Sequence, residues 1–285
     1  MAEAGSGPRA AIRLPDSFRA RVDEVLAGRV EPASPRDAAT VMLLRPAGEG
    51  LEVYLLRRQP TMAFAPGAMV FPGGGVDPRD ADGDVAWAGP DPAEWGRLLD
   101  APAQLARELV CAAVRETFEE SGVLLAGPSA DSLVADTRGD DWEADRLALL
   151  DRSLSLAEFL GRRRLVLRSD LLRPWARWVT PIVEARRYDT RFFAAELPAG
   201  QLTRDVGGEA DQVAWLTPQA ALAAARSREI MLLPPTAVTL GELAACGSVP
   251  AALAARRRIT SVLPEITVAE GAVWLTIPGD LEYPL

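Results

Sequence analysis

The sequence predicts one α/β or α+β domain, because β-rich runs alternate with stretches of helical periodicity along most of the chain. The chain has 285 residues, 48% of them apolar, which is enough for a sizeable core. No run reaches transmembrane length, and residues 1–14 carry no apolar signal core. We therefore expect a flexible tail over residues 1–14 and a single domain over residues 15–285, with no membrane partner.

The strands are expected near the start and in the second half of this domain. Residues 38–46 and 51–59 are β-rich runs separated by the short segment AGEG, which predicts a hairpin. Residues 68–76 predict a third strand that continues into a glycine loop. Later β-rich runs span residues 174–183, 191–197, 210–217 and 271–279.

Helical periodicity predicts the remaining elements. A short helix is expected at 15–28, ended by Gly28, and a long one at 102–122, ended by Gly122. Residues 75–102, before the long helix, carry seven acidic residues and four prolines, which is typical of an inserted loop. Further helices are expected at 140–164, 218–229, 235–246 and 250–258, the last three in a helical C-terminal extension.

Composition excludes several kinds of chemistry. The chain contains no His and no Lys, so all 31 basic residues are Arg. Catalysis by His triads, His-ligated zinc or a His general base is therefore excluded. The net charge of −9 argues against a nucleic-acid partner. Cys111 and Cys246 form no metal-binding pattern and no disulfide framework, which suits a reducing cytoplasm.

The long helix carries a cluster of carboxylates in the stretch RETFEESG. Glu116, Glu119 and Glu120 stand at positions i, i+3 and i+4, so they share one helix face. Two such charges about 5 Å apart repel by roughly 3 kcal/mol at an effective dielectric constant of about 20. Arg115 cannot neutralise three carboxylates, whereas a divalent cation can. On its own, the helix is either a metal site or an ordinary solvated face.

The neighbouring residues resemble the Nudix box, G-x5-E-x7-R-E-U-x-E-E-x-G-U, where U is a bulky apolar residue. The second half matches residues 115–123, with Thr117 as the one departure, and Gly74 in FPGG matches the box glycine. The box is interrupted, since 41 positions separate Gly74 from Arg115 where an uninterrupted box has 14. The position of the first box glutamate stays open between Asp80, six residues after Gly74, and Glu108.

The interrupted box, the preceding FAPGAMVFPGG and the later RRYDTRFFAAELP resemble the mammalian peroxisomal coenzyme A diphosphatase branch of the Nudix superfamily. This resemblance implies a Nudix α/β/α sandwich with a mixed sheet and extra helices. It also implies hydrolysis of a diphosphate linked to a nucleoside, with Mg2+ or Mn2+ as the cofactor.

The resemblance also assigns roles around the metal. Glu119 and Glu120 would be the principal metal ligands, and Glu116 a further ligand or the base that activates water. Arg115 would hold the glutamates in place, and the backbone carbonyl of Gly74 would complete the ligand set. A carboxylate from a later loop, Glu209 or else Asp211, would join the site, or it is simply a solvated loop acid.

A coenzyme A signature of the superfamily, LLTxR-Sx3-R-x3-G-x3-FPGG, predicts the substrate. Arg58, Gly67 and Phe71 fall in register with it, but Ala63 stands where the signature has a second arginine. The 3′-phosphate of coenzyme A needs an arginine partner. The later loop offers Arg186, Arg187 and Arg191, with Tyr188 to stack on a base, unless these are ordinary surface residues.

We therefore expect a diphosphatase that acts on a small nucleotide, with coenzyme A or acyl-coenzyme A favoured. The intact glutamates fit a diphosphatase of NADH, FAD or ADP-ribose equally well. A Nudix domain that senses a nucleotide without cleaving it is the alternative outside the enzymes. The sequence carries no convincing helix-turn-helix for such a role. A homodimer is expected only because dimers are common in the superfamily.

Overall fold

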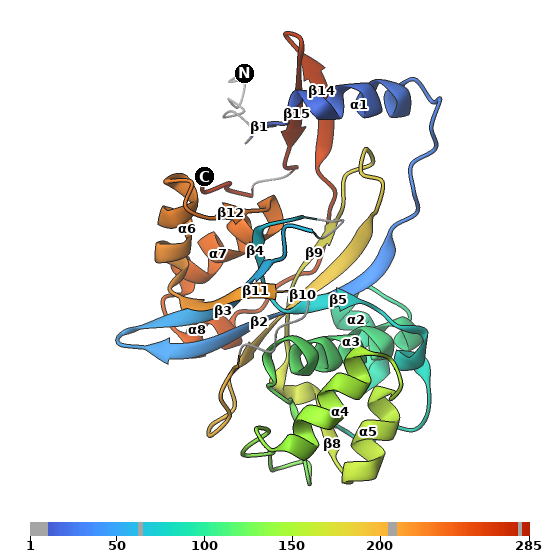
Figure 1. The fold of residues 1–285 in the computed structure, drawn as a ribbon, viewed down its shortest axis with the longest axis vertical. Helices are drawn as coiled ribbons and strands as arrows, with labels where there is room; N and C mark the ends of the chain where they lie inside the picture. The colour runs from blue at the N-terminus through green and yellow to red at the C-terminus, as the bar shows by residue number, and fades with distance from the viewer. Residues whose placement is uncertain (1–10, 62–64, 205–209, 279–280) are drawn as a thin grey trace, which may run out of the picture.

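The centre of the fold is a mixed nine-stranded sheet (Figure 1). In this computed structural model, residues 11–61, 65–204, 210–278 and 281–285 are described. β2 (Arg36–Ala47) and β3 (Gly50–Arg58) form the predicted hairpin, and β10 (Tyr188–Glu196) lies parallel to β2. The other strands of the sheet are β4 (Ala68–Val70), β5 (Gly73–Gly75), β9 (Arg173–Val179), β11 (Ala210–Leu216), β12 (Met231–Leu232) and β13 (Ser261–Val262).

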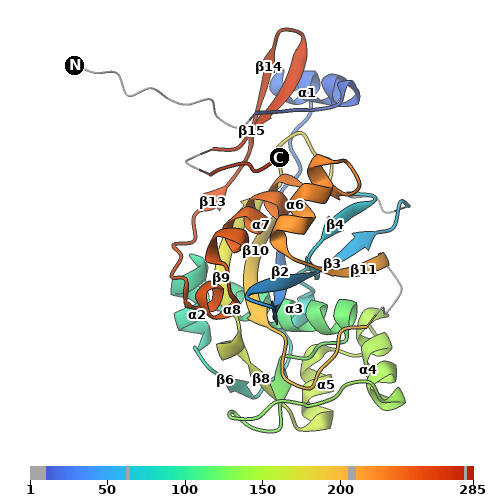
Figure 2. The same cartoon turned by 90° about the vertical axis from the view of Figure 1, so that its left-hand side faces the viewer.

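Helices cover both faces of this sheet, because neighbouring residues of its central strands point to opposite sides. On β10, Phe193 and Ala195 pack with the long helix α3 (Ala103–Ser121), whereas Phe192 and Ala194 belong to the opposite core. That second core is closed by α6 (Pro218–Arg226), α7 (Pro234–Cys246) and α8 (Val249–Ala254), which Figure 2 shows across the sheet from α3. The fold is therefore the expected α/β/α sandwich.

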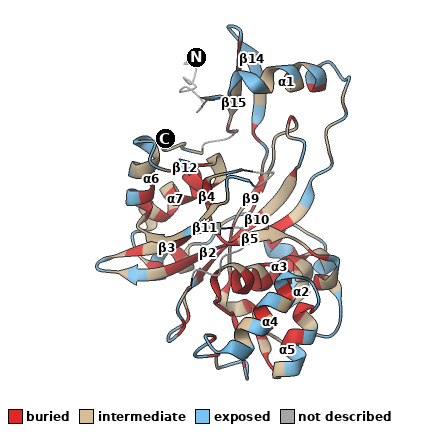
Figure 3. Ribbon diagram, in the orientation of Figure 1, coloured by how far each residue is buried: buried red, intermediate tan, exposed pale blue. Residues whose placement is uncertain are grey.

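The acidic segment before α3 is folded onto the sandwich. It contains the 3-10 helix η2 (Pro78–Ala81), the strand β6 (Trp87–Ala88) and the helix α2 (Pro92–Leu99). Trp95 of α2 is 1% exposed, and its ring lies edge-on to Phe193 with the centroids 5.8 Å apart. The insertion is thus anchored in the same core as α3, as the red buried positions in Figure 3 illustrate.

Two more helices extend this side of the molecule. α4 (Asp140–Leu150) and α5 (Leu156–Arg163) follow α3, with the short strand β7 (Ala126–Gly127) between α3 and α4 and β8 (Val166–Arg168) after α5. β6, β8 and β7 form a small separate sheet. Phe118 of α3 stacks on Phe159 of α5 with ring centroids 5.3 Å apart, and Trp142 of α4 lies edge-on to both rings.

The two ends of the chain meet in a second small sheet. β1 (Ala11–Arg13) pairs with β15 (Ala272–Thr276), which also pairs with β14 (Glu265–Ala269). The 3-10 helix η1 (Asp16–Phe18) leads into α1 (Arg19–Leu26), whose Val22 and Val25 pack near Val273. The predicted tail over residues 1–14 is therefore wrong for residues 11–13. They are ordered by a strand more than 250 residues away, which local sequence patterns do not reveal.

Candidate active site

The site is built at the C-terminal half of α3. Gly122 ends this helix with a left-handed φ of +73°, and its N–H donates to the carbonyl of Phe118 at 2.9 Å. Thr117, the one departure from the box pattern, is fully buried, and its hydroxyl donates to the carbonyl of Ala113 at 2.7 Å. The hydroxyl of Thr117 therefore finds its hydrogen-bond partner within the helix, so the buried threonine is tolerated at this position.

The glycine loop lies directly against these glutamates. The N–H of Gly73 donates to Oε2 of Glu120 at 2.7 Å. β5 pairs with β2 so that Gly74 lies opposite Ala39, which fixes the loop to the sheet. A Cβ atom at Gly74 would lie 2.5 Å from Oε1 of Glu116, so only glycine lets the loop approach the carboxylate this closely.

The buried guanidinium of Arg115 connects the glutamates of α3 to the glycine loop and to Asp80. Its guanidinium donates to Glu116 Oε1 at 2.7 Å, to Glu119 Oε1 at 3.3 Å and to the carbonyl of Gly75 at 3.1 Å. It also donates to both carboxylate oxygens of Asp80 at 2.9 Å. Burial disfavours the charged guanidinium, but these carboxylates outweigh it and raise the pKa of Arg115. Arg115 thus contacts Glu116, Glu119 and Asp80, and its role as the residue that holds the glutamates for a metal stays a prediction.

Asp80, one of the two candidates for the first acidic position of the box, is a buried partner of Arg115. Its side chain is 1% exposed and forms a bidentate pair with Arg115. η2 brings it there, because Asp80 Oδ2 also accepts from the N–H of Asp77 in a capping box. The signal was present, since Asp80 follows Gly74 by six residues, as the first acid does in G-x5-E. Glu108, the other candidate, instead accepts from Gln104 at 2.8 Å on an exposed face.

The glutamates of α3 carry an excess of negative charge. Burial raises the pKa of Glu116 to about 7, with the charge of Glu119 adding to the effect and Arg115 opposing it. Burial likewise raises the pKa of Glu119. Both carboxylates are therefore costly to ionise in the absence of a further cation.

The carboxylates of Glu116, Glu119 and Glu120 are of the chemical type that a hard divalent cation prefers. Over residues 11–61, 65–204, 210–278 and 281–285, however, no group of three His, Cys, Asp or Glu is arranged to hold a metal ion. Arg115 lies between the carboxylates of Glu116 and Glu119, while Glu120 is bonded to Gly73. The carboxylates are thus satisfied by protein donors in this conformation.

The residues of the coenzyme A signature flank β4. Gly67 has a φ of +73°, and its N–H donates to the carbonyl of Arg58 at 3.0 Å, which joins the residue before β4 to the end of β3. Phe71 is 2% exposed and lies edge-on to Phe192, with ring centroids 6.4 Å apart. Phe71 therefore packs in the core on the α7 side of the sheet, which also contains Phe192 of β10.

Arg187 directly precedes β10, and Arg191 lies within it. β10 runs parallel to β2, and its first residues pair with the same part of β2 as the glycine loop, since both Arg191 and Gly74 lie opposite Ala39. Arg187 is buried and donates to the carbonyls of Thr180 and Ala33 at 2.9 and 2.8 Å. Arg191 is 2% exposed and pairs with Asp37 and Asp189 at 3.0 and 2.9 Å. Both arginines therefore spend N–H donors on contacts within the protein, and those donors are not available to a substrate phosphate.

Arg186 and Tyr188 differ from these two arginines. Arg186 is exposed, and Tyr188 is half-buried at the first position of β10. Glu209 lies outside the described residues. Asp211 falls at a bulge of β11, and only its backbone is described. The structure therefore brings Arg115, Glu116, Glu119, Glu120 and Gly74 together. The substrate candidates are divided, because Phe71 lies in the core on the other side of the sheet and the later candidates lie at the start of β10.

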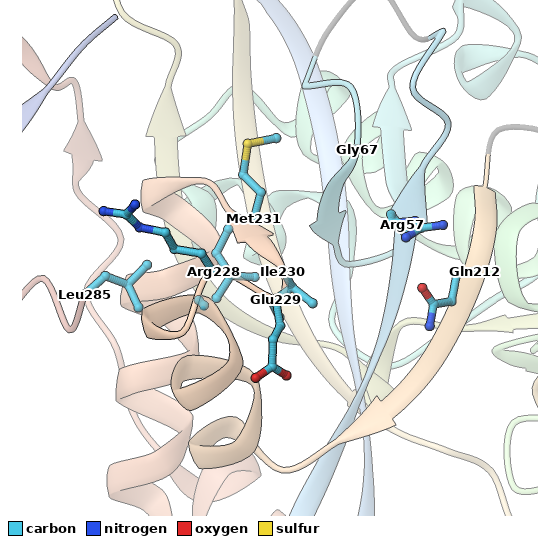
Figure 4. A pocket seen from close by; sticks show the side chains of 10 residues that line it. Arg57, Gly67, Gln212, Arg228, Glu229, Ile230, Met231 and Leu285 are labelled. Atoms are coloured by element: carbon cyan, nitrogen blue, oxygen red, sulfur yellow. The ribbon is translucent and has the colours of Figure 1, made fainter.

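A groove of about 730 Å³ lies between β3, β4 and the segment that leads into β12 (Figure 4). Arg57, Gly67 and Gln212 line one side of it, and Met231 and Leu285 contribute exposed apolar side chains. The α3 glutamates do not line this groove.

The chain is similar to Nudix proteins in sequence and in structure. It is 28% identical to the acyl-coenzyme A diphosphatase NUDT19 of Xenopus laevis over 82% of this chain and 71% of that protein. The human protein of the same name is 29% identical over 94% of this chain and 81% of its own length. A crystal structure of a Nudix hydrolase from Alicyclobacillus acidocaldarius superposes with a TM-score of 0.65 at 29% identity, covering 79% of this chain and 98% of that one.

The sandwich, the glycine loop and the glutamate helix define a Nudix hydrolase. More specifically, residues 91–243 match the model of the NUDT19 Nudix domain, which is more than half of the chain, and the protein belongs to this family. The match begins after Gly74 and takes in α2, so part of the acidic insertion belongs to the family's domain. Within the part of the chain that the structure describes, no helix is long and apolar enough to cross a membrane.

Proposed function

We propose that this protein is a metal-dependent diphosphatase that cleaves coenzyme A or acyl-coenzyme A. The observation that carries the proposal is the Arg115 cluster, which holds Glu116 and Glu119 beside the backbone of Gly74. The substrate is supported by relatives named acyl-coenzyme A diphosphatase, whose similarity extends over 82–94% of this chain.

We propose that Glu116, Glu119, Glu120 and the carbonyl of Gly74 hold Mg2+ or Mn2+. When bound, such an ion supplies an activated water and neutralises charge on the diphosphate. Arg115 is proposed to orient the carboxylates of Glu116 and Glu119 through its hydrogen bonds to them. Asp80 in turn fixes the guanidinium of Arg115 through two hydrogen bonds. Glu116 is proposed as a further ligand or as the base that activates water, because its carboxylate lies against the backbone of Gly74 and accepts a hydrogen bond from Arg115.

The remaining members of the proposed site divide by exposure. Arg186 and Tyr188 are proposed to contact the nucleotide directly, since Arg186 is exposed and Tyr188 is half-buried at the start of β10. Arg187 and Arg191 are proposed to act by fixing the start of β10 through Ala33 and Asp37.

The remaining assignments concern the coenzyme A signature before the box, the later acid, the location and the assembly. Arg58, Gly67 and Phe71 are proposed to shape the approach to the glycine loop, with Glu209 as a further acid from the later loop. Both cysteines are free, which supports the cytoplasm as the proposed location. A homodimer is the proposed assembly, and light scattering of the purified protein tests it directly.

The substrate is tested by comparing kcat/KM for coenzyme A, dephospho-coenzyme A, NADH and ADP-ribose in Mg2+. We expect coenzyme A to be preferred. Arg186→Ala should reduce kcat/KM for coenzyme A but not for dephospho-coenzyme A, because only the former carries a 3′-phosphate. Arg162→Ala, at an exposed end of α5, is the matched control.

The alternatives give different results in the same comparison. Ala63, where the signature has an arginine, favours a dinucleotide diphosphatase, and preference for NADH or ADP-ribose would support that function. Binding of a nucleotide without cleavage of any of the four compounds would support a sensing domain and contradict the proposed hydrolysis.

A further inference from the structure

The carbonyl groups at the end of α3 are bound by two side chains and one backbone N–H from outside the box. The last four carbonyls of a helix have no partner within it. Here NH1 of Arg146, on α4, donates to the carbonyl of Glu119 at 2.8 Å. The N–H of Arg204 donates to the carbonyl of Ser121 at 3.1 Å, and the hydroxyl of Thr137 donates to that of Gly122 at 2.6 Å. The end of the glutamate helix is therefore fixed by the segments that follow it.

Arg146 is the charged member of this set, and it is held rigidly. Its side chain is 2% exposed, and its Nε and NH2 form a bidentate pair with Glu143 at 3.0 and 2.6 Å. Glu143 is also paired with Arg204 at 3.2 Å, and Arg204 donates to the carbonyl of Thr137 at 2.9 Å. The guanidinium therefore has one well-defined position against the backbone of Glu119.

The position of the Arg146 guanidinium affects the electrostatic environment of Glu119 and Glu120. The C-terminus of a helix carries a partial negative charge, so carboxylates in its last turn are disfavoured and a cation there is favourable. Glu119 and Glu120 lie in the last turn of α3. Arg146 brings a buried positive charge to the carbonyl of Glu119, which offsets that cost and fixes the backbone from which the carboxylates project.

We propose that Arg146 is a positioning residue for the metal-binding carboxylates of α3, acting through the carbonyl of Glu119 rather than by contact with metal or substrate. This inference rests on the proposed function, because it presupposes a divalent ion at Glu119 and Glu120. It assigns to α4 a part in the metal site, although α4 follows the Nudix box in the chain.

Binding of Mn2+ to the purified full-length protein, measured by the loss of the free-Mn2+ paramagnetic resonance signal, tests the inference. Arg146→Gln should raise the Kd for Mn2+ about tenfold, the usual effect of losing a residue that orients metal ligands. Arg146→Lys should recover part of this affinity, because it restores the charge but not the bidentate pair with Glu143. The KM for Mg2+ should rise in parallel, with a smaller change in kcat at saturating metal.

Arg163→Gln is the matched control. Arg163 pairs with Asp145 and Asp141 of α4 and lies 3.6 Å over the ring of Trp142, but none of these contacts reaches α3. Its loss should lower the melting temperature and leave the Mn2+ affinity within about twofold of wild type. An equal loss of affinity in Arg163→Gln would show that general damage to α4 is responsible and would overturn the inference.

Glu143→Gln gives a second test if Arg146→Gln does not fold, because it loosens Arg146 without removing it. Mn2+ affinity several-fold weaker than wild type supports the inference, and an unchanged affinity contradicts it. An unchanged Kd in a folded Arg146→Gln would contradict it as well. Absence of Mn2+ binding by the wild-type protein is a separate result, which would refute the proposed metal site itself.

Discussion

Replacing Asp80 with asparagine removes the charge from a buried ion pair while keeping the size of the side chain. Asp80 is 1% exposed and Arg115 is 8% exposed, and two hydrogen bonds of 2.9 Å join them. Removing one partner of a buried pair costs about 3–5 kcal/mol. Arg115 keeps Glu116, Glu119 and the carbonyl of Gly75, so we expect the low end, about 3 kcal/mol.

Thermal unfolding measures this cost. For a chain of this size, about 3 kcal/mol corresponds to a fall in Tm of about 6 °C. The released guanidinium remains paired with Glu116 and Glu119, so Asp80→Asn should also raise the Mg2+ concentration needed for half-maximal activity. Asp84→Asn, an exposed acid in the same segment, should change neither quantity. An Asp80→Asn protein that melts like wild type would refute the role given to this pair.

Three further changes follow from the same geometry. Gly74→Ala places a Cβ 2.5 Å from Glu116 and should abolish most activity, as initial rates at saturating metal will show, whereas retained activity would mean that the loop can retreat. Glu116 has a raised pKa of about 7 against a usual 4.5, so the metal-free protein should lose stability as pH rises from about 4.5 to 7. Melting curves in EDTA and in Mg2+ at pH 5.5 and 7.5 should therefore show the larger metal stabilisation at pH 7.5, and equal stabilisation would contradict the raised pKa. Phe71→Ala removes a buried ring packed on Phe192 and should cost about 3–5 kcal/mol in urea unfolding, with a loss under about 1 kcal/mol arguing against a core position.

The helix of the site was predictable because its information is local. The i, i+3, i+4 spacing of Glu116, Glu119 and Glu120 places them on one face whatever surrounds the helix. Gly74 was predictable because a backbone that approaches a carboxylate needs a residue without a Cβ. The sandwich followed from the resemblance and agrees with the alternation of core residues along β10.

Other parts depend on contacts that a local pattern does not contain. Asp80 follows Gly74 at the box spacing, but its substitution for glutamate and the interruption of the box left that position open. Arg187 and Arg191 resemble anion ligands in the sequence, and only the fold brings Ala33 and Asp37 to them. The strand at residues 11–13 depends on β15, at the other end of the chain.

The pairing of α4 with the end of α3 is of the same kind. Arg146 appears in the sequence as an ordinary residue of an acidic helix, and it lies 27 positions from the carbonyl of Glu119 that it binds.

Mass analysis of the products formed from coenzyme A, in Mg2+ or Mn2+ and in EDTA, tests whether the protein is a metal-dependent coenzyme A diphosphatase. We expect 3′,5′-ADP and 4′-phosphopantetheine in either metal, with neither product in EDTA or from Glu120→Gln. Cleavage of coenzyme A by the Glu120→Gln variant, or by the wild-type protein in EDTA, would contradict the role given to the glutamates of α3. Intact coenzyme A after prolonged incubation of the wild-type protein with either metal would contradict the proposed substrate.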